Sequence, residues 1–204
     1  MLLQLRKSEC LHERPFFVWE PLPTACKTTN LQSFLEACKL VDVFSPNHIE
    51  LNALFQDTPT AVFNSEALEL YGQTILDSSM GPNSDGIIII IRAAEHGALS
   101  MSQKSRPTWL PSFYGKESSK VVDPTGAGNT FLGGFVAGWQ KTADVRESVC
   151  YAHVAASFAL EQIGLPKVCN QSGNVACNGA SVLDRLQEYR RRLGEAAILS
   201  ERVL

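Results

Sequence analysis

The sequence lacks a long apolar run, an excess of positive charge and an apolar leader. Its 204 residues include 18 Lys and Arg against 21 Asp and Glu, a formal net charge of −3. Such a chain offers no broad basic surface to nucleic acid or to an anionic membrane. The purest apolar run, residues 87–91, is far shorter than a membrane span, and the first residues do not resemble a signal peptide. We therefore predict a cytoplasmic protein with no nucleic-acid partner and no membrane.

The cysteines follow no ligand or disulfide pattern. There is no C-x-x-C pair, which argues against a zinc site, and without an export signal we predict reduced thiols with mostly structural roles. The six positions are Cys10, Cys26, Cys38, Cys150, Cys169 and Cys177.

Short apolar runs alternate with amphipathic stretches along a chain that is 45% hydrophobic. This alternation predicts an α/β fold with a mainly parallel sheet, in which ligands lie beyond the carboxyl ends of the strands. The expected strands are 15–19, 41–44, 86–92 and 120–122, with two further short edge strands near Leu99 and Trp109. The expected helices are 31–38, one from Pro46 with Ser45 as its N-cap, 64–76, one from about 145 to 163 with Thr142 as its cap, and one after the capping-box spacing of 181–184.

One segment carries most of the functional signal. Asp123-Pro124-Thr125-Gly126-Ala127-Gly128-Asn129 follows a predicted strand and leads into an apolar helix. Glycines let the backbone approach a ligand, and the first amides of a helix have no partner of their own. Those amides and the helix dipole favour an anion, of which phosphate is the obvious candidate. The residue types in this turn exclude a P-loop, which needs Lys before Ser or Thr. They also exclude a dinucleotide-binding fingerprint, which needs a small residue where this chain has Phe131.

The full string closely resembles the C-terminal signature of the PfkB-type (ribokinase-like) carbohydrate kinases. The resemblance implies a ribokinase-like α/β/α sandwich and ATP-dependent phosphoryl transfer to a hydroxyl of a sugar or nucleoside substrate. It implies ATP and Mg²⁺ as cofactors and places Thr125, Gly126, Ala127 and Gly128 at the nucleotide phosphates.

A second match is Ser45-Pro46-Asn47-His48-Ile49-Glu50. It resembles the family's Asn-x-x-Glu motif, which implies that Asn47 lies at the transferred phosphate and that Glu50 helps to hold magnesium. One carboxylate, acting through water, suits a cation that retains several waters. The residues alone allow a plainer interpretation, in which Asn47 caps a helix and the negative charge of Glu50 interacts favourably with the helix dipole.

The position of the catalytic base departs from the family pattern. The family has Asp where this chain has Asn129, and an amide does not accept a proton at a useful pH. Asn129 can still orient a hydroxyl, and Asp123 remains one strand-end away as a second candidate catalytic residue. A fungal branch of PfkB-like proteins resembles this chain and also has Asn at the position of Asn129. The alternative is that Asn129 is an ordinary residue of the helix start.

A weaker match follows the Ile-rich strand, where the family tends to have Gly-x-x-Gly beside the nucleotide. Gly97 matches the second glycine and is a candidate nucleotide contact, whereas Ala94 replaces the first and restricts the backbone there.

The resemblance covers only the C-terminal portion of a family member. We expect an irregular end at 1–14, a kinase-like domain over 15–194 and a tail over 195–204, with the N-terminal strands and the lid missing and an exposed sheet edge that favours self-association. Three hypotheses follow: a kinase homologue whose activity resides in a longer product, a non-catalytic nucleotide-binding protein that acts through protein partners, and a structural fragment with no ligand.

Overall fold

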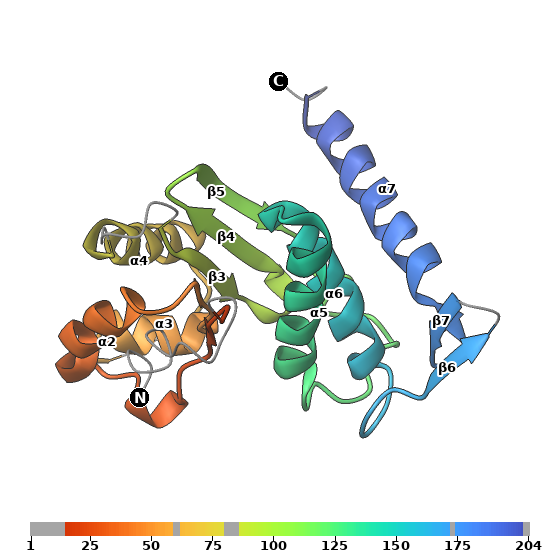
Figure 1. Cartoon of the computed structure of the whole chain (residues 1–204), viewed down its shortest axis with the longest axis horizontal. Helices are drawn as coiled ribbons and strands as arrows, with labels where there is room; N and C mark the ends of the chain where they lie inside the picture. The colour runs from red at the N-terminus through yellow and green to blue at the C-terminus, as the bar shows by residue number, and fades with distance from the viewer. Residues whose placement is uncertain (1–14, 59–61, 80–85, 172–173, 202–204) are drawn as a thin grey trace. The chain divides into compact units, whose positions relative to one another are not determined.

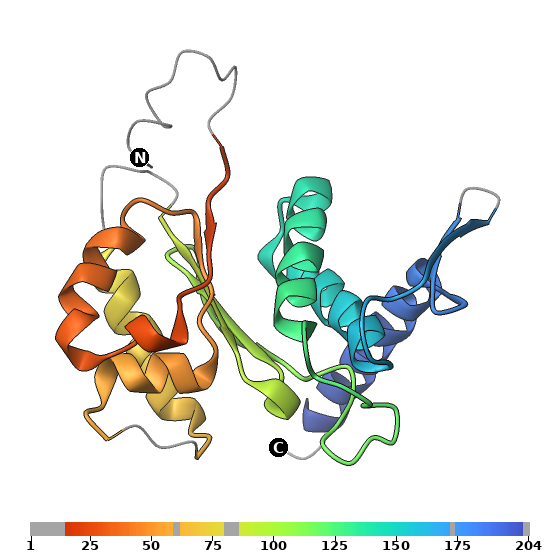
Figure 2. The same ribbon diagram turned by 90° about the horizontal axis from the view of Figure 1, so that it is seen from below.

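The computed structural model describes residues 15–58, 62–79, 86–171 and 174–201. The predicted irregular end at 1–14 and Cys10 lie outside these residues. The chain divides into two compact units, which we treat separately (Figures 1 and 2). Unit 1 runs to Ala94 and resumes at 98–109, and unit 2 consists of 95–97 and 110–204.

Unit 1 is built on a five-stranded sheet. The strands lie side by side in chain order: β1 (Val18–Trp19), β2 (Val43–Phe44), β3 (Ile88–Arg92), β4 (Ala98–Ser102) and β5 (Ser105–Leu110). β1, β2 and β3 are parallel, as predicted, with Val43 opposite both Val18 and Ile88. β4 is antiparallel to β3 and leads into β5 through a two-residue turn, so the second half of the sheet is a meander. The strands predicted near Leu99 and Trp109 are present as β4 and β5, but only β5 is an edge strand, because β4 lies between β3 and β5.

Three helices cover one face of this sheet, as Figure 2 shows. They are α2 (Leu31–Cys38), α3 (His48–Phe55) and α4 (Ser65–Ser78), and short 3₁₀ turns at Pro23–Ala25 and Thr28–Asn30 precede α2. Side chains that are buried on these helices form one core with alternate residues of β3, Ile89 and Ile91. That pattern follows from the period of two along a strand. The predicted N-cap at Ser45 is wrong, because α3 starts two residues later and Asn47 supplies the cap.

Unit 2 is mainly helical. It contains α5 (Ala127–Thr142), α6 (Val145–Leu160), α7 (Val182–Glu201) and a small sheet of β6 (Val168–Gln171), β7 (Asn174–Cys177) and β8 (Ala180–Ser181). α5 and α6 lie side by side (Figure 1). The cap of α6 is Asp144, whose side chain accepts from the Glu147 amide, so the predicted cap at Thr142 is wrong. The predicted cap of α7 is present, because the Asp184 amide donates to Ser181 Oγ.

The strand predicted at 120–122 does not form. Val122 is 57% exposed, and its amide donates to the carbonyl of Leu160 at the end of α6. The apolar pattern of this segment is too short to specify a strand without a neighbouring strand, and here the end of a helix supplies the hydrogen-bond acceptor. The glycine turn therefore follows an extended loop.

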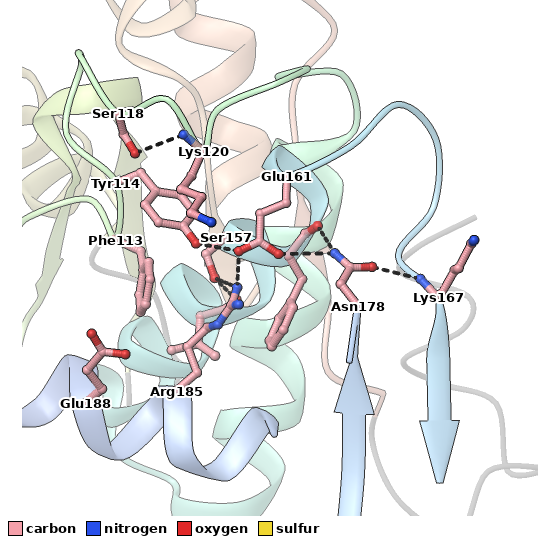
Figure 3. A network of polar contacts seen from close by, with 12 residues as sticks. Phe113, Tyr114, Ser118, Lys120, Ser157, Glu161, Lys167, Asn178, Arg185 and Glu188 are labelled. Atoms are coloured by element: carbon pink, nitrogen blue, oxygen red, sulfur yellow. Dashed lines mark hydrogen bonds and ion pairs between the residues drawn. The ribbon is translucent and has the colours of Figure 1, made fainter. Parts of the chain in front are cut away.

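A network of polar contacts joins the small sheet to α6 and α7 (Figure 3). Arg185 pairs with Glu161 at 2.8 Å, and Asn178 donates both to Glu161 at 3.2 Å and to the Phe158 carbonyl at 3.0 Å. Burial acts to raise the pKa of Glu161, but hydrogen bonds from Tyr114, Asn178 and Arg185 outweigh it, so the pKa is lowered. Burial and the bond to Glu161 raise the pKa of Tyr114 to about 12. The network therefore holds a charged carboxylate in place.

Two findings bear on the cysteines and on membrane spans over the residues that the structure describes. Cys26, Cys38, Cys150, Cys169 and Cys177 are free thiols. No helix within the described ranges is long and apolar enough to cross a membrane.

Candidate functional site

The start of α5 is capped by a glycine. Gly126 has φ 81°, in the left-handed region that glycine adopts without strain, and α5 has no side-chain hydrogen bond at its cap. Thr130 starts the helical pattern by donating to the Gly126 carbonyl at 3.0 Å. Within the described ranges, no group accepts from the amides of Gly128 and Asn129. Two donors at the positive end of a 16-residue helix therefore remain for a ligand.

The loop before this cap is fixed by a local hydrogen bond. The amide of Thr125 donates to Asp123 Oδ1 at 2.9 Å. This bond and the hydroxyl of Thr125 lower the pKa of Asp123, which is therefore charged at neutral pH. Thr125, Gly126 and Asn129 are all exposed. A negative ligand approaching the amides meets little steric hindrance, and no atom of the described chain lies within 4 Å of a side-chain position at Gly126.

Close packing against α6 holds α5 in place. A Cβ at Gly134 would lie 2.6 Å from the Ala155 Cβ, and one at Gly138 would lie 2.8 Å from the Ser148 Cα. Glycine at these two positions lets the backbones of α5 and α6 approach closely, so Gly134 and Gly138 are needed for packing, whereas a Cβ at Gly133 would meet nothing within 4 Å. Phe131 and Phe135 are buried on the same helix.

The buried histidine of unit 2, His153, has the surroundings of a structural residue and not of a ligand-binding one. His153 packs against the ring of Phe131, with ring centroids 5.1 Å apart. Burial lowers its pKa to about 3, against the effect of a hydrogen bond with the Leu110 backbone. His153 is thus neutral at ordinary pH, as expected of a buried structural residue.

The start of α3 is capped by its own side chains. Asn47 Oδ1 accepts from the Glu50 amide at 2.8 Å, and the Asn47 amide donates to Glu50 Oε2 at 2.7 Å. These two bonds form a capping box, which satisfies two of the donors that a helix start normally leaves open, the amides of Asn47 and Glu50. The cap interpretation of Asn47 and Glu50 is therefore confirmed as geometry.

Glu50 also belongs to a buried ion cluster. Arg92, at the end of β3, places Nη2 2.5 Å from Glu20 Oε1 and 3.8 Å from Glu50 Oε2. The same nitrogen donates to the Ser45 carbonyl at 3.1 Å. Burial raises the pKa of Glu50 and the charge of Glu20 adds to this, whereas the Asn47 amide and Arg92 oppose it. Sequence reasoning missed Arg92 and Glu20 as parts of a site, although Glu20 directly follows β1 and Arg92 ends β3.

The loop after β3 contains two residues with positive φ. Gly97 has φ 94°, and a Cβ there would lie 2.0 Å from the Leu110 carbonyl oxygen, so only glycine fits. Ala94 has φ 49°. Alanine therefore adopts a conformation that glycine takes without strain, and the substitution strains the loop without preventing its turn.

The comparisons with known proteins agree on one family. A model of the pfkB family of carbohydrate kinases matches residues 21–171, which is most of the chain. An uncharacterised protein of Schizosaccharomyces pombe is 33% identical over 214 residues, and protein MAK32 of Saccharomyces cerevisiae is 30% identical over 203. The first alignment covers 97% of this chain and 58% of the relative, and the second covers 95% and 53%. The chain belongs to the PfkB family of carbohydrate kinases.

The solved structures place this PfkB chain in the ribokinase-like fold. A ribokinase of Cryptococcus neoformans var. grubii in complex with ADP superimposes with a TM-score of 0.59 at 22% identity, over 80% of this chain and 51% of that one. The chain spans about half the length of the curated relatives it matches.

The site residues expected for a PfkB protein fall in different units. Asn47 and Glu50 lie in unit 1, whereas Gly97 and the turn from Asp123 to Asn129 lie in unit 2. Thr125, Gly126, Ala127 and Gly128 form one continuous turn into α5, with Asp123 hydrogen-bonded to it. Asn129 stands on the exposed first turn of the helix, where the family has its base. Its role and that of Gly97 stay predictions.

The donor set around Glu50 does not suit a protein-held Mg²⁺. Mg²⁺ takes oxygen ligands at about 2.0–2.1 Å and retains several waters. The Glu50 side chain is only 6% exposed, and its Oε2 accepts the Asn47 amide and faces Arg92. Within the described ranges, no group of three or more His, Cys, Asp or Glu side chains could hold a metal ion.

Proposed function

We propose that the turn before α5 binds the phosphate groups of ATP or ADP, and that the chain is the nucleotide-binding part of a PfkB-type phosphotransfer protein. The observation that carries this proposal is the glycine cap. Gly126 contributes no side chain to the helix start, and the amides of Gly128 and Asn129 have no acceptor within the described ranges. The family membership and the ADP-bound ribokinase with the same fold support a nucleotide over other anions.

The amides act on the phosphates by charge. Amides that are already oriented stabilise negative charge without a cost of reorganisation. The positive end of α5 adds to this effect within its first turn. Asp123 is charged, but its carboxylate accepts the Thr125 amide, so it is directed into its own loop. Thr125, Ala127 and Gly97 complete the set of residues that we propose as nucleotide contacts, and Asn47 is proposed from its motif.

Transfer of the phosphoryl group would require an acceptor hydroxyl and a group that takes its proton. We propose a sugar or a nucleoside as the acceptor class of the whole protein, in keeping with the family. Asn129 cannot take the proton, and the lowered pKa of Asp123 makes that carboxylate a weak base. This residue pair favours a second candidate function, a nucleotide-binding pseudokinase that acts through protein partners.

Several expectations remain as proposals. Mg²⁺ stays a proposed cofactor that accompanies the nucleotide, but the contacts of Glu50 do not suit a direct ligand, so no step is assigned to a protein-held metal. A cytoplasmic location stays a prediction. Self-association through the sheet edge is also a proposal, and β1, two residues long, forms one edge of the sheet.

Calorimetry with ADP tests nucleotide binding. We expect the unaltered chain to bind ADP and Gly126→Val to abolish the binding, because a β-branched residue resists φ 81° and its side chain blocks the phosphate. Gly133→Val is the matched control, since Gly133 also has open space around its Cβ position but lies inside α5 with no positive φ. A folded, unaltered chain that binds no ADP would contradict the proposal.

A phosphate-transfer assay separates the two candidate functions. Positioning of reactants is worth about 7–11 kcal/mol, whereas a general base contributes roughly 10²–10⁴-fold. We therefore expect the 204-residue chain to transfer little phosphate from ATP to ribose or adenosine, and Asn129→Asp to restore little of it. The same substitution should raise turnover clearly in a longer chain that also holds the acceptor. Rapid transfer by the unaltered chain would exclude the pseudokinase.

A further inference from the structure

The carboxyl ends of the three parallel strands meet at one cluster of charges. Glu20 follows β1, Ser45 follows β2, and Arg92 ends β3. The Arg92 amide donates to the Pro46 carbonyl at 3.0 Å, and Asn47 forms a parallel bridge with Arg92. The backbone thus fixes Arg92 beside the start of α3, where its side chain is 12% exposed.

We propose that Arg92 takes the place of a divalent cation beside Glu50, so that the Asn47–Glu50 motif of this protein works without a protein-held metal. The guanidinium pairs with Glu20 and faces Glu50, and so it supplies the positive charge that two neighbouring carboxylates require. Arg92 is therefore the residue that decides which cation this motif accepts.

Because this cluster is buried, the guanidinium of Arg92 excludes a divalent cation from the same place. The Glu50 and Arg92 side chains are 6% and 12% exposed, and charges this far from water need a partner. Arginine stays protonated at any ordinary pH, so its charge is permanent and repels a second cation. The oxygen of Glu50 that faces Arg92, Oε2, also accepts the Asn47 amide of the capping box. A hydrated metal ion beside this carboxylate therefore lacks the charge balance that it needs.

If Arg92 formed only a structural ion pair with Glu20 and Glu50, its removal would have a different effect. Removing one partner of such a pair lowers stability, and nothing more follows. A guanidinium that takes the place of a metal leaves two adjacent carboxylates when it is removed, Glu20 and Glu50, and these oxygens are the ligands that hard divalent cations favour. Gain of a metal site on loss of Arg92 thus distinguishes the two roles.

The test measures binding of Mn²⁺ alone to the full, nucleotide-free chain by electron paramagnetic resonance. We expect the unaltered chain and Glu50→Gln to bind Mn²⁺ equally weakly. Arg92→Met should bind Mn²⁺ at least about 10-fold more tightly, and adding Glu50→Gln to it should remove the gain. Arg92→Lys keeps the positive charge and should gain no site. Arg106→Met is the matched control, because it removes an exposed arginine of β5.

Each outcome decides the matter, and none depends on whether the α5 turn binds nucleotide. A Mn²⁺ site in the unaltered chain that Glu50→Gln removes would overturn the proposal, since Glu50 would then bind metal despite Arg92. A folded Arg92→Met that gains no site would also overturn it. Circular dichroism checks the fold of each variant. If Arg92→Met does not fold, Arg92→Gln takes its place, with the same expected gain of a Mn²⁺ site and the same loss of that gain when Glu50→Gln is added.

Discussion

Helices α3 and α5 both begin within a motif of the same family, yet their first amides are used in opposite ways. At α3, the Asn47 side chain accepts from the Glu50 amide and the Glu50 side chain accepts from the Asn47 amide. At α5, Gly126 has no side chain to offer, and the amides of Gly128 and Asn129 remain without an acceptor in the described part of the chain. The residue at the cap therefore decides whether a helix start is closed by the protein or left for a ligand.

The two helix starts also differ in what holds them. The start of α3 is held by the charge of Arg92, which faces Glu50, and by the hydrogen bond from the Arg92 amide to the Pro46 carbonyl. α5 is held by shape, through Gly134 and Gly138 against α6. A ligand site gains from this arrangement, because close backbone packing positions the helix without using its terminal donors.

The largest expected effect comes from breaking the packing of α5. Gly134→Leu should lower the free energy of unfolding by about 3 kcal/mol, because a Cβ there would lie 2.6 Å from the Ala155 Cβ and 2.8 Å from the Tyr151 carbonyl oxygen. Urea denaturation measures the change. Gly133→Leu, one residue away in open space, should not destabilise the protein, and equal losses in both variants would contradict the packing argument.

Removal of the α3 cap should have a smaller effect. Asn47→Ala should cost about 1 kcal/mol of stability, the usual value for loss of an N-cap side chain. Asp144→Ala removes the matching cap of α6 and should cost a similar amount. The ADP affinity of these variants, measured in parallel, tests the nucleotide contact proposed for Asn47, which predicts weaker binding only in Asn47→Ala. A stability loss much below that of Asp144→Ala would show that the capping box is not the main role of Asn47.

The positive φ values of Gly126 and Ala94 allow a still finer comparison. Glycine adopts such a φ freely, whereas Ala94 at φ 49° is strained. Ala94→Gly should therefore raise the melting temperature slightly, by relief of strain that exceeds the added freedom of the unfolded chain, a net gain of roughly 0.5 kcal/mol. Gly126→Ala, which introduces the same strain, should shift it the opposite way. A lower melting temperature for Ala94→Gly would show that the loop carries no strain.

The smallest effects should appear in the pH dependence of stability, with opposite signs in the two units. Glu161 has a lowered pKa, so its contribution is present above the ordinary pKa of a glutamate and is lost as pH falls through its folded value. Glu50 has a raised pKa, so its contribution is fully present below the ordinary value and declines as pH rises through its folded value. Urea denaturation of Glu50→Gln and Glu161→Gln between about pH 3 and pH 7 measures both slopes. Loss of the same slope in both variants would contradict this assignment.

Sequence patterns predicted the local features of the chain. The helical spacing of Leu31, Phe34 and Cys38 gave α2, the Ile-rich run gave β3, and the glycine turn gave the start of α5. Errors arose where a choice between neighbours was needed. Ser45 and Asn47 are both good caps, and only the backbone path after β2 selects Asn47. The segment 120–122 has strand-like residues, but its amide bonds to the end of α6.

The candidate site divides in the same way. The sequence by itself determined the glycine cap of α5, because a positive φ and open amides are properties of a few consecutive residues. Only the tertiary structure decided the state of Glu50, because Glu20 and Arg92 come from the ends of two strands, β1 and β3, which meet where the parallel strands end together. Hydrogen bonds across three or four residues can be read along the chain, whereas an ion pair between distant segments depends on which strands the sheet makes neighbours.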